Sequence, residues 1–149
     1  MTDDEKFMNL AIEQAKIAKD KGSLPFGAVV VHEGEIIGQG HDNASISHDV
    51  TAHAELDAIR QACEVLGRNN LEDCEIYCTN EPCNMCASGI FQADIRTIVI
   101  GLERTDLPAL LRPRNIRIFD LAKDLSYVPT ITTGILKDKI LELFADIKK

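Results

Sequence analysis

Several features that would indicate a membrane, secreted or disulfide-stabilised protein are missing from this 149-residue sequence. No apolar run approaches the ~20 residues that a membrane-spanning helix needs, so no membrane association is expected. The first five residues are acidic, whereas a secretory signal would be basic and then apolar, and we therefore expect a cytoplasmic protein. The five cysteines are an odd number, which favours free thiols and metal ligands over a framework of disulfide bonds.

Basic residues are also in short supply. The chain has 16 lysines and arginines against 24 aspartates and glutamates, which gives a formal net charge of -8. A protein whose main partner is nucleic acid usually carries a basic surface, because contacts with phosphates supply much of the affinity. A local basic patch could still exist on an acidic protein. The charge balance nevertheless argues against nucleic acid and favours a small neutral substrate.

The length suits one domain with a sizeable core, and no repeat, low-complexity tract or linker divides it, so we expect a single domain over residues 1–149. Apolar residues at helical spacing, preceded by a capping box at Thr2 and Glu5, predict a first helix that Gly22 ends. Strands are expected at 28–31, 36–40, 73–79 and 97–100, with a weaker one at 116–119 and an ambiguous stretch at 127–133.

Further helices are expected between and after these strands. Residues 41–51 are interpreted as a polar loop, after which Thr51 is expected to cap a second helix. Pro82 suits the first position of a third helix, which runs to about Gln92, and a last apolar stripe begins at Leu136. Strands that alternate with helices predict an α/β protein in which helices cover both faces of a sheet.

Two short motifs, each at the start of an expected helix, concentrate residue types that bind metal. The first is His53-Ala54-Glu55, and the second, about thirty residues later, is Pro82-Cys83-Asn84-Met85-Cys86. One histidine and two cysteines provide three ligands for zinc, and three protein ligands leave the fourth tetrahedral position open for water. Zinc lowers the pKa of that water to about 7, and Glu55 is left free to transfer protons. The spacing therefore predicts a catalytic zinc site.

Each motif alone has a more ordinary interpretation. His53 could be a histidine at a capped helix start, and a Cys-x-x-Cys pair also occurs in redox sites and structural zinc sites. A closed structural site would need a fourth ligand, for which Cys74 and Cys78 are the nearby cysteine candidates. We expect both, and Cys63, to be core residues, because free cysteine is among the most buried residue types. Whether Cys74 or Cys78 approaches the zinc stays open.

The two motifs resemble the zinc-dependent cytidine/deoxycytidylate deaminase superfamily, whose signature is H-x-E…P-C-x-x-C. The resemblance runs from about Leu24 to Gly101. Within the superfamily it points to the bacterial guanine deaminase and tRNA adenosine deaminase branch. The tract from Arg60 to Gly67 leans toward the guanine deaminases, and so does Phe26, since tRNA-acting relatives usually have a smaller aliphatic residue there.

The resemblance implies a three-layer α/β/α sandwich with a five-stranded mixed sheet, usually assembled as a homodimer. It implies one zinc ion per chain, with His53, Cys83 and Cys86 as the ligands and Glu55 as the proton shuttle.

It also implies three substrate contacts. Asn43 matches an asparagine that hydrogen-bonds the base, Phe26 would stack on or wall the ring, and the backbone amide of Ala54 could polarise the substrate. Without the resemblance, Asn43 could be a loop residue that forms its own turn, and Phe26 could be a core residue.

The C-terminal third departs from both relatives. Residues 103–108 stand where tRNA adenosine deaminases usually have a Lys-Thr-Gly and Gly-Ser loop. Residues 144–149 lack the aromatic, acidic tail with which small guanine deaminases help to close a pocket.

We expect hydrolytic deamination of a nucleobase or nucleoside, with guanine to xanthine and ammonia as the leading reaction. Cytosine, a nucleoside or another heterocyclic amine is the alternative, followed by tRNA adenosine. A non-catalytic, deaminase-like binding subunit is disfavoured because Glu55 is intact beside all three ligands.

Overall fold

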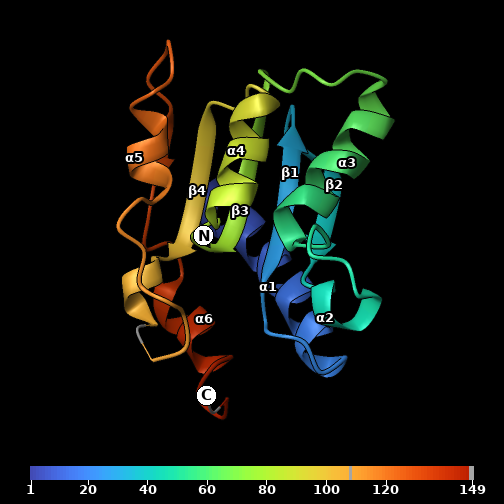
Figure 1. Cartoon of the computed structure of the whole chain (residues 1–149). Coiled ribbons are helices and arrows are strands. Elements are labelled where there is room, and N and C mark those ends of the chain that lie inside the picture. Colours follow the sequence, from blue (N-terminus) through green and yellow to red (C-terminus); the bar gives the residue numbers. More distant parts are fainter. Residues whose placement is uncertain (108, 148–149) are drawn as a thin grey trace.

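The computed structural model describes residues 1–107 and 109–147 (Figure 1). Five strands form one sheet in the order β2-β1-β3-β4-β5. Strand β1 (Gly27–His32) pairs antiparallel with both β2 (Glu35–His41) and β3 (Cys74–Asn80). Strand β4 (Thr97–Leu102) runs parallel to β3, and β5 (Thr130–Thr132) runs parallel to β4. The prediction of an α/β fold on a five-stranded mixed sheet is confirmed.

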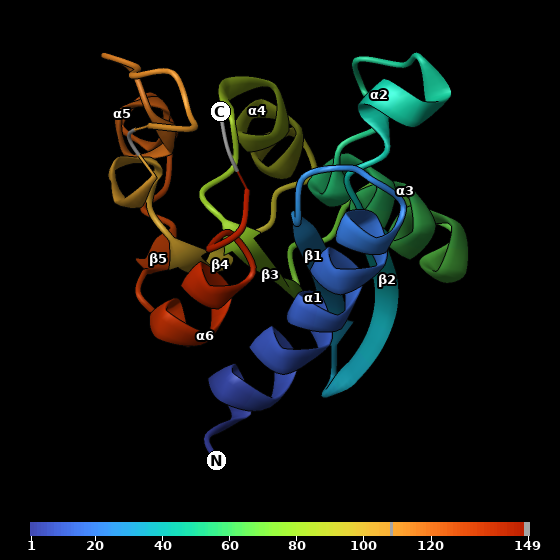
Figure 2. The ribbon, with the colours of Figure 1, turned by 90° about the horizontal axis from the view of Figure 1, so that it is seen from below.

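Helices cover both faces of this sheet (Figure 2). Helices α1 (Asp3–Asp20) and α6 (Lys137–Glu142) lie on one face. Helices α3 (Ala54–Leu66), α4 (Asn84–Gln92) and α5 (Ile118–Ala122) lie on the other. Each interface has its own buried apolar cluster, because successive side chains of a strand point to opposite faces: Val29 and Val31 pack with α1, and Val30 packs with α3 and α4. The result is a three-layer sandwich.

The first helix follows the prediction from its capping box. The hydroxyl of Thr2 accepts the backbone N–H of Glu5 at 3.1 Å, and the Glu5 carboxylate accepts the backbone N–H of Thr2 at 3.0 Å. The helix ends just before Gly22, whose φ of 90° lies in the left-handed region that glycine adopts without strain. Local sequence signals are therefore sufficient to predict where α1 begins and where it ends.

Two expected helix starts need correction. Residues 41–51 contain a short helix, α2 (Ala44–Ser47), and Thr51 does not cap α3, because its hydroxyl and N–H both bond to Asp49 at 2.7 and 2.9 Å. The N-cap residue of α3 is His53. Likewise Pro82 lies before α4, and Cys83 is the N-cap residue of that helix. Both corrections place a metal-binding residue type at the cap itself.

The prediction of a strand at 116–119 is wrong, because α5 begins at Ile118. The carboxylate of Asp120 accepts the backbone N–H of Arg117 at 3.0 Å and fixes the first helical turn. The ambiguous stretch 127–133 supplies the short strand β5, and a 3-10 turn, η1 (Arg104–Asp106), follows β4. Of the helices in the described ranges, none is long and apolar enough to cross a membrane.

Candidate metal centre and active site

The two sequence motifs meet where α3 and α4 begin (Figure 1). His53 occupies the N-cap position of α3 and Cys83 that of α4, so both residues lie at helix N-termini. The partial positive charge at a helix N-terminus favours thiolate over thiol, and a thiolate is the form of cysteine that binds zinc. The helix N-termini thus favour the thiolate form of cysteine, which metal binding requires.

The three donor atoms have the separation that a zinc ion requires. Nδ1 of His53 lies 3.6 Å from Sγ of Cys83 and 3.4 Å from Sγ of Cys86, and all three donor atoms lie within 4.8 Å of one another. A tetrahedral zinc ion, with Zn–N of about 2.05 Å and Zn–S of about 2.3 Å, places nitrogen and sulfur about 3.6 Å apart. The donor set therefore fits zinc in both chemistry and spacing.

None of the remaining cysteines supplies a fourth metal ligand. Cys74 and Cys78 are buried in the apolar cluster between the sheet and α3–α4, and Cys63 packs against it. Burial raises the pKa of the Cys78 thiol, and burial together with the charge of Asp73 raises the pKa of Cys74 to about 11. Within residues 1–107 and 109–147, His53, Cys83 and Cys86 form the sole cluster of three metal-binding groups. A zinc ion held by these three groups would keep its fourth tetrahedral position open for water or substrate.

The three metal-binding groups shift one another's pKa values. A hydrogen bond from the Cys86 thiol, reinforced by His53, lowers the pKa of Cys83 to about 4. The pKa of Cys86 is raised, because its thiol donates that hydrogen bond and is buried. The pKa of His53 is raised chiefly by its hydrogen bond with Cys83. Zinc binds cysteine as the thiolate and histidine as the neutral imidazole, so binding of a metal cation to this cluster would release protons.

Glu55 lies beside this cluster as a buried acid. Its residue exposure is 8%, and burial, followed by the negative charge of Cys83, raises the pKa of its carboxyl group to about 7. A group with a pKa near the working pH both accepts and donates protons efficiently. Glu55 is therefore suited to general acid–base work at neutral pH.

Two adjoining cavities open onto the cluster. The inner one, of about 60 Å³, is lined by the site residues His53, Ala54, Glu55, Cys83 and Phe26 and by five others: Asp42, Asn80, Glu81, Arg104 and Leu111. The outer one, of about 570 Å³, shares Phe26, Asp42 and His53 and extends toward α1, α2 and the C-terminal end. Five of the seven residues singled out from the sequence thus line one cavity, and Cys86 is buried behind them.

Asn43 has a different position. Its backbone N–H donates to the carbonyl of Ala52 at 3.0 Å, and its own carbonyl accepts the N–H of Ser47 at 2.9 Å. Its neighbours Asp42 and Ala44 line the cavities. Among the residues that the structure describes, Asn43 lines neither cavity. Contact between Asn43 and a base stays a prediction.

Sequence reasoning missed the role of Glu81. The sequence is equally compatible with a helix-start acid at this position, but the Glu81 side chain is only 2% exposed and forms a bidentate ion pair with Arg117. Its Oε1 accepts from Nη2 of Arg117 at 2.5 Å, and its Oε2 accepts from Nε of Arg117 at 3.0 Å. Oε1 also accepts the backbone N–H of Arg104 at 2.9 Å. The one sequence signal for a role of Glu81 was its position directly after an apolar strand. Its partner Arg117 is 36 residues away, so the ion pair could not be predicted from local sequence patterns.

The C-terminal segment also reaches the site. Phe144 is buried, and its ring centroid lies 6.0 Å from that of Phe26. Nζ of Lys19 donates to the carbonyl of Leu143 and to the carboxylate of Asp146, both at 2.7 Å, and Ile147 lines the outer cavity. The final segment therefore walls the cavity even without an aromatic, acidic tail.

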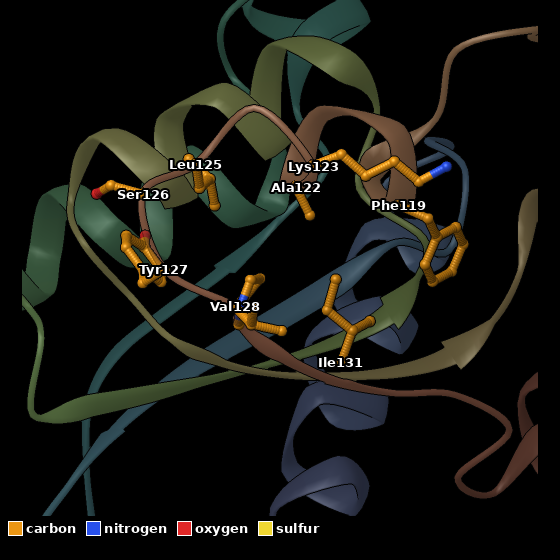
Figure 3. Close-up of a pocket in the computed structure, with 9 residues that line it drawn as sticks. Phe119, Ala122, Lys123, Leu125, Ser126, Tyr127, Val128 and Ile131 are labelled. Carbon is orange, nitrogen blue, oxygen red and sulfur yellow. The ribbon is translucent and has the colours of Figure 1, made fainter.

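A separate cavity of about 400 Å³ lies between α5 and β5, and its lining shares no residue with the metal centre (Figure 3). Phe119, Ala122, Leu125, Tyr127 and Ile131 contribute to its apolar wall. None of the described lining residues is a histidine, cysteine, aspartate or glutamate. It is not part of the active site.

Comparison with known proteins agrees with this geometry. The family model of the cytidine and deoxycytidylate deaminase zinc-binding region matches residues 1–102. The chain is 49% identical over 103 residues to guanine deaminase of Bacillus subtilis (strain 168), covering 68% of this chain and 66% of that protein. It is 43% identical over 97 residues to the tRNA-specific adenosine deaminase of Aquifex aeolicus (strain VF5), covering 65% of this chain and 64% of that protein.

These matches span slightly less than two thirds of either relative's length. A solved structure of guanine deaminase from Nitrosomonas europaea is 26% identical, with a TM-score of 0.79, and the likeness covers 93% of this chain and 81% of that one. Guanine and tRNA adenosine deaminases are about equally similar to the chain, so the comparisons leave the substrate undecided. The chain belongs to the zinc-binding cytidine and deoxycytidylate deaminase family.

Proposed function

We propose that this chain is a hydrolytic deaminase that removes an exocyclic amino group from a nucleobase or nucleoside, with guanine, converted to xanthine and ammonia, as the leading substrate. The observation that carries the proposal is the buried acid Glu55 on the wall of the same small cavity as His53 and Cys83. We assign His53, Cys83 and Cys86 as the ligands of one zinc ion per chain.

Zinc held by His53, Cys83 and Cys86 would act as a Lewis acid and would activate water as a nucleophile at neutral pH. The Glu55 carboxylate accepts a proton from the attacking water. The resulting carboxylic acid donates this proton to the ring nitrogen next to the reacting carbon. A second transfer through Glu55 delivers a proton to the departing amino group, so that water and the amine are converted to a carbonyl and ammonia.

Other groups of the cavity hold the ring. Ala54 is the first residue of α3, so its N–H has no acceptor within the helix, and Ala54 lines the cavity. Phe26 forms an apolar wall that Phe144 supports from behind. An aromatic ring of the substrate would lie between this wall and Glu55, which keeps bulk water away from the reacting carbon.

Guanine leads the substrates for two reasons. The resemblance at Phe26 points to the guanine deaminase branch, since tRNA-acting relatives usually have a smaller aliphatic residue there, and guanine deaminase of Bacillus subtilis is a 49% identical relative. Deamination of tRNA adenosine is the second candidate, supported by the 43% identical relative in Aquifex aeolicus. The net charge of -8 disfavours a large RNA partner.

An ammonia-release assay tests the proposal. Zinc-loaded protein is incubated with guanine, cytosine, adenine, their nucleosides and a tRNA anticodon stem-loop, and the Glu55→Gln variant gives the background. We expect ammonia and xanthine from guanine above that background. Activity on the stem-loop alone would replace guanine by tRNA adenosine, and absence of ammonia from every substrate with zinc bound would refute the deaminase proposal.

A further inference from the structure

The wall of the inner cavity includes a buried amide, the side chain of Asn80. This residue ends β3 and lines the inner cavity together with His53 and Glu55. Cys78 and Ile76, two and four residues earlier on the strand, belong to the apolar cluster beneath α3 and α4. Because alternate side chains of a strand share a face, Asn80 lies on that same face of the sheet. The strand thus carries an amide to the side of the sheet where the metal centre lies.

The orientation of this amide is fixed by Thr79. The Thr79 hydroxyl accepts the backbone N–H of Gly27 at 3.0 Å, and its single hydrogen is left to be donated. Oδ1 of Asn80 lies 2.8 Å from the hydroxyl oxygen, whereas the carbonyl oxygen of Gly27 lies 3.3 Å away, so Oδ1 is the better acceptor. Since Oδ1 is occupied, the amino group at Nδ2 is the part of the amide that Asn80 can offer to a ligand.

The amino group of Asn80 has no partner within the protein. Asn80 is 8% exposed and Nδ2 is buried, and Nδ2 forms no hydrogen bond with any residue in the ranges 1–107 and 109–147. A buried donor without an acceptor costs free energy, and buried polar groups are seldom left unpaired without a functional reason. The inner cavity is the space that Asn80 borders, so a ligand that fills this cavity can supply the acceptor.

Two charged neighbours of Asn80 on the cavity wall are engaged by other protein groups. Glu81 accepts hydrogen bonds from Arg117 and from the backbone N–H of Arg104. Nε of Arg104 donates to the carbonyl of Arg112 at 2.6 Å. Asn80 differs from these neighbours because it is neutral and its N–H groups are uncommitted. A neutral donor suits the carbonyl oxygen of an uncharged base.

We propose that Asn80 determines substrate specificity by donating a hydrogen bond from Nδ2 to the carbonyl oxygen of a base whose ring lies between Phe26 and Glu55. Guanine and cytosine each carry one such oxygen, whereas adenine has none. A buried donor discriminates against a ligand that lacks the acceptor, because the donor then stays unpaired. This inference rests on the proposed function and deepens it, since it narrows the substrate class to amino-substituted bases that also carry a carbonyl group.

Binding titrations with ligands that differ in this oxygen test the proposal. Guanine and 2-aminopurine, which lacks the 6-oxo group, are titrated by calorimetry into the zinc-loaded Glu55→Gln protein, in which turnover is suppressed. Cytosine and 4-aminopyrimidine, which lacks the 2-oxo group, are titrated in parallel so that the result does not depend on the choice of base. We expect each oxo base that binds to do so about tenfold more tightly than its analogue, because the analogue leaves the buried donor unpaired.

Variants at Asn80 locate the effect. Asn80→Leu has a similar volume but no donor, and Asn80→Ser keeps a hydroxyl for the bond with Thr79 but has no amide. Each variant should reduce the ratio of the two dissociation constants to within about twofold. The ratio compares two ligands on the same protein, so a smaller folded fraction does not alter it. Asn70→Leu makes the same exchange at an exposed position beyond the C-terminal end of α3 and should leave the ratio unchanged.

Equal affinity for an oxo base and its analogue would overturn the proposal, and so would a preference that survives both Asn80 variants or that falls equally in Asn70→Leu. Absence of binding by all four ligands would also overturn it. Ammonia release from guanine is measured separately with the protein that retains Glu55. A preference that depends on Asn80, without ammonia release, would leave the binding assignment standing and refute the proposed function. Ammonia release together with a preference independent of Asn80 would refute the assignment alone.

Discussion

Removal of Arg117 should destabilise the protein through the charge that it leaves behind. In the Arg117→Met variant, Glu81 keeps the backbone N–H of Arg104 but loses both hydrogen bonds from the guanidinium. The Glu81 side chain is 2% exposed, so it would be left buried without its guanidinium partner. Loss of one partner of a buried ion pair costs about 3–5 kcal/mol, because the other charge stays desolvated.

The expected loss lies at the lower end of that range. Arg117 is 22% exposed, so its own desolvation is incomplete, and Arg104 still donates one bond to Glu81. We therefore expect the free energy of unfolding, measured by urea denaturation, to fall by about 3 kcal/mol in Arg117→Met. The KM for the substrate should rise as well, because Arg104 and Leu111 of the disturbed segment line the catalytic cavity.

A double variant separates the buried charge from lost packing. Glu81→Gln combined with Arg117→Met removes the unpaired carboxylate and should recover about 2 kcal/mol of the lost stability. The control Arg112→Met, at an exposed arginine of the same segment, should lower the stability by less than about 0.5 kcal/mol. A loss below about 1 kcal/mol in Arg117→Met, or a double variant no more stable than the single one, would refute the reasoning.

Three further perturbations test other parts of the structure. In Gly40→Ala, the added Cβ would lie 2.3 Å from the carbonyl oxygen of Ala54, so the start of α3 must move. We expect the zinc affinity, measured by metal titration, to fall, and the free energy of unfolding to fall by about 3 kcal/mol. Normal zinc affinity would contradict this. Phe144→Ala should cost about 3 kcal/mol in chemical denaturation and raise KM more than it lowers kcat, since Phe144 supports Phe26 behind the cavity; an unchanged KM would contradict that support. Hydrogen bonds from Arg68 and His32 lower the pKa of Asp73 to about 2 from 3.8, so the stabilisation from Asp73 is present above pH 3.8 and lost as the pH falls through about 2. The melting temperature of Asp73→Asn should therefore converge with that of the wild type over this range, and a difference independent of pH would contradict the pairing.

The fold and the metal centre were largely predictable because their signals are local. The capping box of α1, the β-branched run of β1 and each of the two motifs that carry the metal-binding residues lie within short segments, where local signals decide the structure. The error at 116–119 has the same origin. An alternation of isoleucine and arginine satisfies a strand pattern, whereas the deciding contact, from Asp120 to the N–H of Arg117, belongs to helix capping.

The walls of the cavity could not be predicted, because they depend on contacts between distant segments. Phe26 meets Phe144, and Glu81 meets Arg117, only after the sheet has brought the C-terminal third against the active site. Neither pairing leaves a periodic trace in the sequence. Assembly as a homodimer and a cytoplasmic location depend on partners and cell context and stay predictions.

The central claim is that Glu55 transfers protons at a zinc site that it does not help to form. The most direct test measures zinc content and ammonia release together in Glu55→Gln, an isosteric change of a side chain on the cavity wall. The account predicts one zinc ion per chain, as in the wild type, with turnover reduced by at least about 10²-fold, the contribution typical of general acid–base catalysis. Turnover close to that of the wild type, or loss of the zinc, would contradict it.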